Sequence, residues 1–543
     1  MTPFSAPLDD ILFTLTHVAG ADRIEGWDGE LVAAILEHFS RFAEEEIAPL
    51  NAIGDAEGCR LENGQVILPA AFAAAYASFC EQGWPSLAVP EAYDGQGQSA
   101  TVLGATTEIF IGACHALHML VGLVPGGIRV LREFASEEQR VRLIAPLASG
   151  EALATMALTE PAAGSDLSVI RTRAERSGEA QGGWRITGEK IFISGGGQNL
   201  SDRILHFVLA RTGTMEEGAR GLSLFACPSH LADGSRNAVS VQRIEEKLGI
   251  HASPTCQMAF DGAEAELIGE EGGGLRCMFA LMDHARLDVS LQGVANAARA
   301  ADIARQYAAE RRQGRRPGQQ GSVTIAEHPD VERMLTIQDS LALGGRAMAL
   351  AALVELDRGE NPLLVDFLTP VCKAFCTDLG SEATDLGIQV LGGYGYLTEY
   401  LVEQHWRDVR IARIYEGTNG IHAVTLVGRL LNLKGGAAAD AFAAMINAVI
   451  AEGEAAGLNV AHLWHAQVAW AQARARIALL EDPQPVAHAF MKLTGLVFFF
   501  AVWLRMEKVA DKATDADRIR RCAAFVRRYF GPEVALWAAR CAA

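Results

Sequence analysis

The chain has 543 residues, half of them hydrophobic, and a formal net charge of −19 at pH 7. A chain of this length forms roughly two to four domains and can bury a large core. The negative charge disfavours nucleic acids and anionic membranes as general partners. An anionic ligand would therefore need a local cluster of arginines.

The cysteines and the amino terminus point to one compartment. The chain has 10 cysteines and no C-x-x-C pair. Cys372 and Cys376 are four residues apart, which favours buried thiols on one helix face over a redox or zinc motif. The amino terminus, MTPFSAPLDD, is typical of neither a secretory nor a transit peptide. We therefore expect a soluble, cytoplasmic protein.

The first part of the chain, residues 1–150, is predicted to be helical. In the segment GELVAAILEHFSRF the apolar residues Leu31, Ile35, Phe39 and Phe42 lie at helical spacing. This spacing predicts that they form the buried face of an amphipathic helix.

Residues 151–272 change to a β-prone pattern. The segment GGWRITGEKIFISGG alternates in polarity around a turn predicted at Gly188-Glu189. The runs RILHFVLART and RGLSLFACP are short, apolar and bounded by glycine, proline or charges. This region is therefore predicted to be a β domain.

From about residue 273 the pattern is helical again. One stripe of a long helix is predicted from Leu287, Leu291, Val294, Ala298 and Ala301. After the polar loop QGRRPGQQGS, further helical segments are predicted at about 327–357, 362–391 and 417–432. The glycine-rich segment LKGGAAADA then indicates a hinge before a helical tail. This order predicts the domains 1–150, 151–272, 273–434 and 435–543.

The longest apolar run in the tail is LTGLVFFFAVWL, from Leu493 to Leu504. Such a run is shorter than the roughly 20 residues that a membrane-spanning helix needs. We expect a buried or dimer-facing helix, with membrane-surface contact as the alternative.

The usual nucleotide and metal motifs are missing. GGYGYL, GGGQNL and GEEGGG do not fit G-x-G-x-x-G, and no G-x-x-x-x-G-K-[ST] is present. The β segments are not interleaved with helices, so a Rossmann domain is not expected. His115 and His118 form an H-x-x-H without a nearby acidic pattern, which favours a core or surface role over metal binding. No metal site is predicted.

Three segments are candidate ligand sites. In MALTEPAAGSD a strand ends in a turn that could bind a heterocycle or a phosphate, or be only a well-formed turn; it presents Thr159, Gly164, Ser165 and Asp166. On the long helix, Arg286 and Arg311 suit phosphates or a salt-bridged surface equally well. The third segment, QVLGGYGYLTEY, leads into RIYEGTNGI, and its adjacent glycines allow another backbone or a ligand to approach closely.

These segments, in this order and spacing, resemble the acyl-CoA dehydrogenase family. TEPAAGSD is similar to its first signature, KIFISGG to its second flavin-facing strand, and ERRQG, QVLGGYGY and YEGTNGI to its later cofactor and base motifs. The resemblance covers about 30–432 and is greatest to the 3-methylmercaptopropionyl-CoA dehydrogenase-like branch, which has a similar carboxy-terminal extension. It implies an α+β fold with a helical amino-terminal domain, a middle β-barrel-like domain, a carboxy-terminal four-helix bundle and an appended helical domain.

The resemblance also implies ligands for this chain. FAD would be held by Met156, Leu158, Thr159, Gly164, Ser165, Phe192, Ser194, Arg311, Gln389, Gly392, Gly393, Thr418 and Asn419. The acyl-CoA would be held by Ser165, Asp283, Arg286, Glu416 and Gly417. Arg311 and the residues of the QVLGG segment would meet the FAD of a partner subunit in a homodimer. Many relatives carry glutamine where this chain has Gly420, so a contact from that side chain is absent.

By the same resemblance, Glu416 is the catalytic base. It would remove the α proton of an acyl-CoA thioester while the β hydride goes to flavin N5, giving a 2-enoyl-CoA. An α proton is weakly acidic, so its removal needs a positioned base, and burial would raise the pKa of that carboxyl. Some relatives place the base where this chain has Ala285. Glu160, before Pro161, is expected to be structural.

The implied substrate is 3-methylmercaptopropionyl-CoA or a straight-chain acyl-CoA, and the implied acceptor is an electron-transfer flavoprotein. The alternative is an acyl-CoA dehydrogenase-like DNA-binding protein of the alkylation response, with little dehydrogenase activity. The segment DRIRRCAAFVRRYF is locally basic, but residues 436–543 contain 12 Lys or Arg against 10 Asp or Glu. A duplex-binding domain has a far more basic surface. We therefore expect neither a nucleic-acid partner nor a membrane span.

Overall fold

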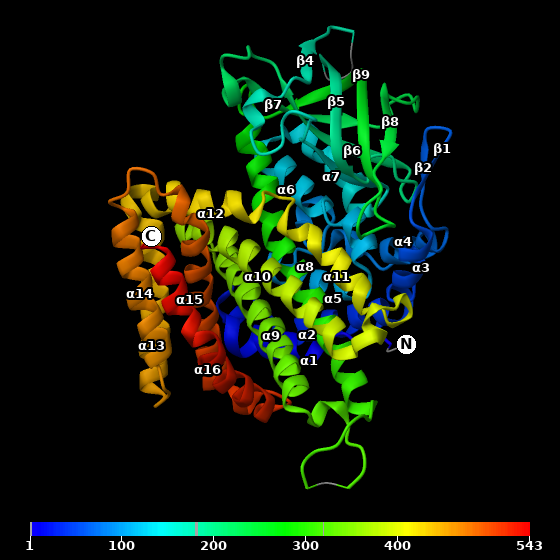
Figure 1. Cartoon of the computed structure of the whole chain (residues 1–543). Helices are drawn as coiled ribbons and strands as arrows, with labels where there is room; N and C mark the ends of the chain where they lie inside the picture. The colour runs from blue at the N-terminus through cyan, green and yellow to red at the C-terminus, as the bar shows by residue number, and fades with distance from the viewer. Residues whose placement is uncertain (1–2, 180–182, 319, 543) are drawn as a thin grey trace. The chain divides into compact units, whose positions relative to one another are not determined.

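The computed structural model describes residues 3–179, 183–318 and 320–542, apart from the side chains of Asp283 and His284. The chain packs into two units, which are described separately (Figure 1). The bundle unit comprises Met1–Glu44, Ala100–Ala113 and Arg286–Ala543. The barrel unit comprises Glu45–Ser99 and Cys114–Ala285. The four domains drawn from the sequence stay a prediction.

A closed sheet forms the centre of the barrel unit. Its strands are β3 (Ala152–Ala157), β4 (Arg173–Arg176), β5 (Gly183–Ser194), β6 (Arg203–Arg211), β7 (Leu222–Pro228), β8 (Val239–Ile244) and β9 (Thr255–Ile268). They pair in the order β3-β6-β4-β5-β9-β7, and β7 also pairs with β6, so the ring closes. β3 is parallel to β6, whereas β5, β7 and β8 run antiparallel to β9. Inside the closed sheet, the aromatic rings of Trp184 and Phe225 meet edge to face, with 5.3 Å between their centroids.

Helices and a short hairpin complete the barrel unit. The elements are α3 (Leu50–Glu57), β1 (Arg60–Glu62), β2 (Gln65–Ile67), α4 (Ala71–Glu81), α6 (Val124–Phe134) and α7 (Glu137–Ser149). Ser136 and Gln139 form a capping box that starts α7.

One predicted turn in this unit is wrong. The chain does not reverse at Gly188, because β5 runs unbroken from Gly183 to Ser194. A Cβ at Gly188 would lie 2.7 Å from the Cα of Thr172, so the glycine permits a close approach of neighbouring backbone inside the sheet. A glycine in a segment of alternating polarity is compatible with a turn and also with a strand that lies close to neighbouring backbone. The sequence pattern does not distinguish these two structures.

The bundle unit is built on long helices. They are α1 (Leu8–Phe13), α2 (Gly29–Phe42), the start of α5 (Ala100–Val121), most of α8 (Gly274–Glu310), α9 (Pro329–Arg358), α10 (Pro362–Leu391), α11 (Val402–Val409) and α12 (Asn419–Gly428). α8 and α10 cross almost backbone to backbone, because a Cβ at Gly293 would lie 2.3 Å from the carbonyl oxygen of Cys376. Cys372 and Cys376 are fully buried on α10, as their spacing predicted.

The predicted buried face of α2 needs correction at Leu31, whereas Phe39 and Phe42 are buried as predicted. On α2 the buried apolar residues include Val32 and Leu36, whereas Leu31 is 47% exposed. Two neighbouring stripes of this helix are equally apolar, so periodicity cannot choose between them. The expected stripe of α8 is largely buried, but the helix is buried on its other faces as well, including Asp288 and Asn296.

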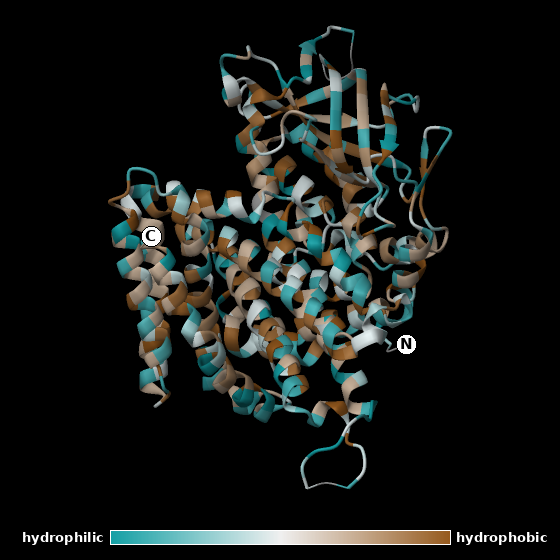
Figure 2. Ribbon diagram, in the orientation of Figure 1, coloured by the Kyte–Doolittle hydropathy of each residue, from teal (hydrophilic) through white to brown (hydrophobic). Residues whose placement is uncertain are grey.

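The appended helices are α13 (Ala437–Ala455), α14 (Ala461–Ile477), α15 (Ala487–Lys508) and α16 (Ala516–Arg540). α15 is mainly apolar and most of its residues are buried, so the prediction of a buried helix is confirmed (Figure 2). The helix has 22 residues and extends beyond the apolar run that the sequence marks. Length therefore does not separate it from a membrane span.

Among the described residues, four helical stretches are long and apolar enough to cross a membrane by length and composition alone. The apolar windows in α5, α9 and the stretch Gln484–Lys508 are 89, 94 and 89% buried inside the fold. The fourth stretch, Asn419–Ala455, is 39% buried. Packing within the fold accounts for the apolar character of the first three.

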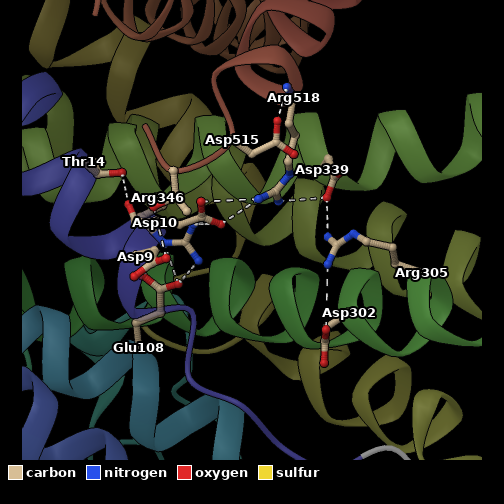
Figure 3. A network of polar contacts seen from close by, with 11 residues as sticks. Asp9, Asp10, Thr14, Glu108, Asp302, Arg305, Asp339, Arg346, Asp515 and Arg518 are labelled. Atoms are coloured by element: carbon tan, nitrogen blue, oxygen red, sulfur yellow. Dashed lines mark hydrogen bonds and ion pairs between the residues drawn. The ribbon is translucent and has the colours of Figure 1, made fainter. Parts of the chain in front are cut away.

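A network of ion pairs joins the amino terminus, the bundle and the last helix (Figure 3). Arg346 of α9 donates to both carboxylate oxygens of Glu108 in α5, at 2.5–3.1 Å, and both side chains are 1% exposed. Arg518 of α16 bridges Asp10 of α1 and Asp339 of α9, at 3.0 and 2.9 Å. The last helix is therefore tied to the bundle by charge as well as by apolar packing.

Replacing Arg346 with methionine should destabilise the protein by about 3–5 kcal/mol, because Glu108 would stay buried without its counter-charge. The matched control is Arg333→Met on the same helix, whose partner Asp330 is 74% exposed. That change should cost about 0–1 kcal/mol. Thermal and urea unfolding midpoints measure both variants, and equal losses would contradict the assignment. The double variant Arg346→Met with Glu108→Gln should recover part of the loss.

Candidate functional site

The segment RIYEGTNGI forms a loop between a 3-10 turn (Arg410–Arg413) and α12. Glu416 and Gly417 both have left-handed backbone conformations, with φ of 53° and 88°. Thr418 then caps α12 by accepting a hydrogen bond from the backbone N–H of Ile421 at 3.2 Å. A left-handed glutamate is strained and persists only where its surroundings hold it. The contacts of this loop, called the base loop below, supply that restraint.

A buried lysine holds the base loop from inside the bundle unit. Lys373 of α10 is fully buried, and its ammonium donates to the carbonyl oxygen of Gly417 at 2.7 Å and to Oδ1 of Asn419 at 3.0 Å. Burial lowers the pKa of Lys373 to about 7, against the opposing charges of Glu416 and Asp378. In its protonated form the lysine places a positive charge directly behind the loop.

The backbone carbonyl of Glu416 is held as well. His422 Nε2 lies 3.0 Å from this oxygen, and Arg286 Nε lies 3.5 Å from it. Burial lowers the pKa of His422 to about 3, so the ring is neutral and donates one proton. These contacts fix the backbone of Glu416. They do not involve its carboxyl group, which stays available for other interactions.

The Glu416 carboxyl has the properties of a base. Its Oε2 atom is buried and has no hydrogen-bond partner among the residues that the structure describes. Burial raises the pKa of Glu416 to about 7, and the positive charges of Arg286 and Lys373 limit the rise. A group that titrates near neutrality can accept a proton and release it again.

A row of polar residues on α8 adjoins the base loop and was missed from the sequence. Asp288, Gln292 and Asn296 lie four residues apart and are buried. The hydroxyl of Tyr415 donates to Oε1 of Gln292. Burial, reinforced by the charge of Glu416, raises the pKa of Asp288 to about 8. The polar spacing inside an apolar helix was the signal that could have revealed this row.

Asn419 has a structural task inside the bundle unit. Its Nδ2 donates to the carbonyl oxygen of Ala374 at 3.1 Å, to Oγ1 of Thr377 at 3.1 Å and to Oδ1 of Asp378 at 3.0 Å. The side chain thus ties the base loop to α10. Its role in FAD binding stays a prediction.

The residues expected to meet FAD from a partner subunit lie together at the surface. Arg311 is exposed and stacks over Tyr394, 5.8 Å from the ring centroid. Gln389 is also exposed, and a Cβ added at Gly392 or Gly393 would meet no atom within 4 Å. The structure thus combines a cation, an aromatic ring and open backbone, which suit a phosphate-bearing ligand.

In the barrel unit, the turn after β3 is built on a buried ion pair. Lys190 donates to Oε1 of Glu160 and to the carbonyl oxygen of Leu158, both at 2.9 Å. Glu160 also accepts from the backbone N–H groups of Arg171 and Thr172, at 2.7 and 2.9 Å. The Glu160 carboxylate therefore accepts hydrogen bonds on both oxygens and stabilises the turn. Gly164 and Ser165 are exposed at its tip.

A neighbouring irregularity in β5 presents an aromatic ring. The pairing of β5 with β9 shifts between Lys190 and Ile193. There Phe192 has a φ of 60° and is 61% exposed. The backbone N–H of Ile191 donates to the carbonyl oxygen of Thr159 at 2.9 Å, which joins this bulge to the end of β3. An exposed ring beside a strand end suits a flat heterocycle.

The structure therefore gathers the predicted site residues into separate groups. The base-loop group contains Arg286, Glu416, Gly417, Thr418 and Asn419. The surface group of the bundle unit contains Arg311, Gln389, Gly392 and Gly393. The barrel-unit group contains Met156, Leu158, Thr159, Gly164, Ser165, Phe192 and Ser194. The side chain of Asp283 lies outside the described residues.

Comparison with known proteins places these groups in one family. Models of the amino-terminal, middle and carboxy-terminal domains of acyl-CoA dehydrogenases match residues 30–151, 155–263 and 272–431. A 3-methylmercaptopropionyl-CoA dehydrogenase of Ruegeria pomeroyi is 42% identical over 483 residues, which cover 84% of this chain and 82% of the relative. A broad-specificity linear acyl-CoA dehydrogenase of Mycobacterium tuberculosis is 33% identical, covering 78% and 74%.

A solved structure shows the same fold over nearly the whole chain. Caenorhabditis elegans ACDH-11 in complex with C11-CoA has a TM-score of 0.81 at 20% identity, covering 97% of this chain and 91% of that one. The sequence resemblance and the expected α+β fold with its appended helices are confirmed. The chain belongs to the acyl-CoA dehydrogenase family, whose general reaction is the FAD-dependent dehydrogenation of acyl-CoA thioesters.

Proposed function

We propose that this chain binds FAD and an acyl-CoA thioester, and that Glu416 is the base that removes the α proton. The observation that carries the proposal is the Glu416 carboxyl, whose buried Oε2 has no hydrogen-bond partner among the described residues and whose pKa is about 7. A purely structural carboxylate would be saturated with donors, as Glu160 is.

The residues present fit FAD in each unit. In the barrel unit, the exposed Phe192 ring beside Thr159 offers a flat apolar surface with polar backbone at its edge. In the bundle unit, Arg311 and the open backbone at Gly392 and Gly393 suit a pyrophosphate. Bound FAD would supply the two-electron oxidant that the family's reaction requires.

The chain's own residues would perform the proton chemistry. The ionised Glu416 carboxyl would form a bond to the α proton as the Cα–H electron pair moves into the new Cα–Cβ double bond and the β hydrogen leaves as hydride to the oxidant. Arg286 and Lys373 would limit the rise in the pKa of Glu416, so that the carboxylate is populated near neutrality. Left-handed Gly417 has no side chain, and a Cβ there would lie 3.0 Å from Nε2 of His422, so the glycine lets this ring pack against the loop beside the base.

The substrate is proposed from the relatives. The 42% identity to a 3-methylmercaptopropionyl-CoA dehydrogenase favours a short thioether-bearing acyl-CoA as substrate. The similarity to a broad-specificity linear acyl-CoA dehydrogenase makes a straight-chain acyl-CoA the alternative substrate. An electron-transfer flavoprotein is the proposed acceptor, as the family resemblance implies. Anaerobic titration of the yellow protein with both kinds of thioester, following flavin bleaching, tests cofactor, reaction and substrate together. No bleaching by any acyl-CoA would refute the proposal.

Replacing Glu416 with glutamine should slow flavin reduction by about 10²–10⁴-fold, the usual contribution of a positioned base. The amide keeps the shape of the side chain, so the variant should stay folded, retain its flavin and bind acyl-CoA. Single-turnover bleaching at saturating substrate separates chemistry from binding. Glu160→Gln is the control and should mainly reduce stability or flavin retention. A rate for Glu416→Gln within a few-fold of wild type would leave Glu416 as a loop residue only.

The rate should also depend on pH in a defined direction. The deprotonated carboxyl is the proton acceptor, so kcat/KM should fall as pH drops below about 7, the pKa of Glu416. The kcat/KM profile reports the free enzyme. A profile that stays flat down to about 4.5, the ordinary value of a glutamate, would contradict the raised pKa.

We also propose a cytoplasmic homodimer in which Arg311 contacts the FAD of the partner subunit. The supporting features are the free thiols of all described cysteines and the exposed Arg311 group. Arg311→Ala should lower FAD occupancy and weaken the dimer together, measured by absorbance and light scattering. Arg316→Ala, exposed in the neighbouring loop, should change neither. Full FAD occupancy in an Arg311→Ala monomer would exclude the intersubunit contact.

The DNA-binding alternative has little support from the last helix. Arg518 pairs with Asp10 and Asp339, and Arg520 and Arg527 pair with Asp511 and Glu507. These arginines are neutralised within the bundle unit and are not presented together as a phosphate-binding surface. Retention on heparin at moderate salt would revive this alternative.

A further inference from the structure

One lysine of the appended helices, Lys492, forms an ion pair with Asp378, a residue that supports the base loop. Lys492 lies in the first turns of α15, and its Nζ is 2.5 Å from Oδ2 of Asp378 on α10. The Lys492 side chain is 23% exposed and that of Asp378 is 12% exposed. The pair is therefore better shielded from solvent than an ordinary surface ion pair.

Asp378 lies at the junction between the appended helices and the base loop. While Oδ2 pairs with Lys492, its Oδ1 accepts a hydrogen bond from Nδ2 of Asn419 at 3.0 Å and pairs with Arg413 at 2.6 Å. Arg413 and Asn419 lie on the two sides of Glu416 in the chain. One carboxylate therefore fastens both ends of the base loop, and the appended domain supplies a countercharge to it.

The chain of contacts continues to the residue next to the base. Asn419 Oδ1 accepts from the Lys373 ammonium, which also donates to the carbonyl oxygen of Gly417. Asp378 and Glu416 both favour the charged form of Lys373. Movement of Asp378 would thus disturb Asn419, Lys373 and the left-handed turn at Glu416 in succession.

Apolar packing keeps Lys492 in place. A Cβ at Gly495, on the same helix, would lie 2.1 Å from the ring of Phe375, so α15 lies directly against α10 there. The Lys492 ammonium also lies over the Phe375 ring, 6.0 Å from its centroid. Helix α15 thus holds Lys492 as a fixed charge at the surface of α10.

We infer that Lys492 is a positioning residue for the reaction: through Asp378 it fixes the base loop, so the appended domain takes part in holding Glu416. Its contribution to the rate rests on the proposed function of Glu416, whereas its effect on the loop does not. Without the Lys492 charge, Arg413 is the remaining direct ion-pair partner of Asp378 among the described residues, and the loop gains freedom. Small displacements of a catalytic group reduce rates by up to about 10²-fold.

The test uses the full-length, flavin-loaded protein and three variants. Lys492→Met removes the charge, and Lys492→Arg should preserve it. Lys508→Met is the matched control, because Lys508 ends the same helix and pairs with Glu452 of α13 at 3.1 Å, within the appended helices. Lys492→Met should accelerate hydrogen exchange in peptides covering residues 410–420 and lower the flavin-reduction rate at saturating acyl-CoA roughly tenfold. The apparent acyl-CoA affinity should stay unchanged.

Lys492→Arg should restore slow exchange and most of the rate, and Lys508→Met should change neither. Asp378→Asn provides a second variant if Lys492→Met folds poorly, and it should also accelerate exchange in the loop. The inference is overturned if Lys492→Met lowers the melting temperature but leaves loop exchange and rate at the level of Lys508→Met. Glu416→Gln separates the proposed function from the role of Lys492. If Glu416→Gln does not slow flavin reduction, Glu416 is not the base, whereas the hydrogen-exchange result for Lys492→Met still tests whether Lys492 fixes the base loop.

Discussion

The geometry of the site depends on a fully buried ammonium group, that of Lys373. An unpaired charge in a protein interior is costly, so the surrounding structure must offer it acceptors. The acceptors are the carbonyl oxygen of Gly417 and Oδ1 of Asn419. The consecutive left-handed residues Glu416 and Gly417 turn that carbonyl toward the lysine. The strain of the loop is thus offset by satisfying a charge that has no access to water.

The same charge also contributes to the pKa of Glu416. Burial alone would push the pKa of Glu416 higher, and burial likewise raises the pKa of the neighbouring Asp288, which the charge of Glu416 raises further. Lys373 and Arg286 act in the opposite direction. The result near neutrality is a balance between desolvation and two cations. Such a balance makes the carboxyl a usable proton acceptor at the pH of a cell.

The order of helical and β regions was predictable because periodicity is local. The predictions failed where tertiary packing decides between equal local patterns, as at Gly188, which stays in a strand, and on α2, where Val32 is buried in preference to Leu31. The loop around Glu416 could be singled out from the sequence because it is one continuous motif, and the catalytic role of Glu416 stays a proposal. Lys373, Asp288 and Asp378 could not be singled out, because each is distant in sequence and reaches the loop only after α8 and α10 have packed.

The appended helices show that a single charge can indicate where a buried helix packs. A run of apolar residues predicts burial, but it does not indicate which neighbour will cover the run. Lys492 stands one residue before LTGLVFFFAVWL, and a charge at the edge of such a run must find a partner or stay at the surface. In the folded chain it finds Asp378, which already holds Asn419 of the base loop. A lone charge beside a buried apolar helix therefore indicates where that helix meets polar parts of the protein, and here that place is Asp378, which supports the base loop.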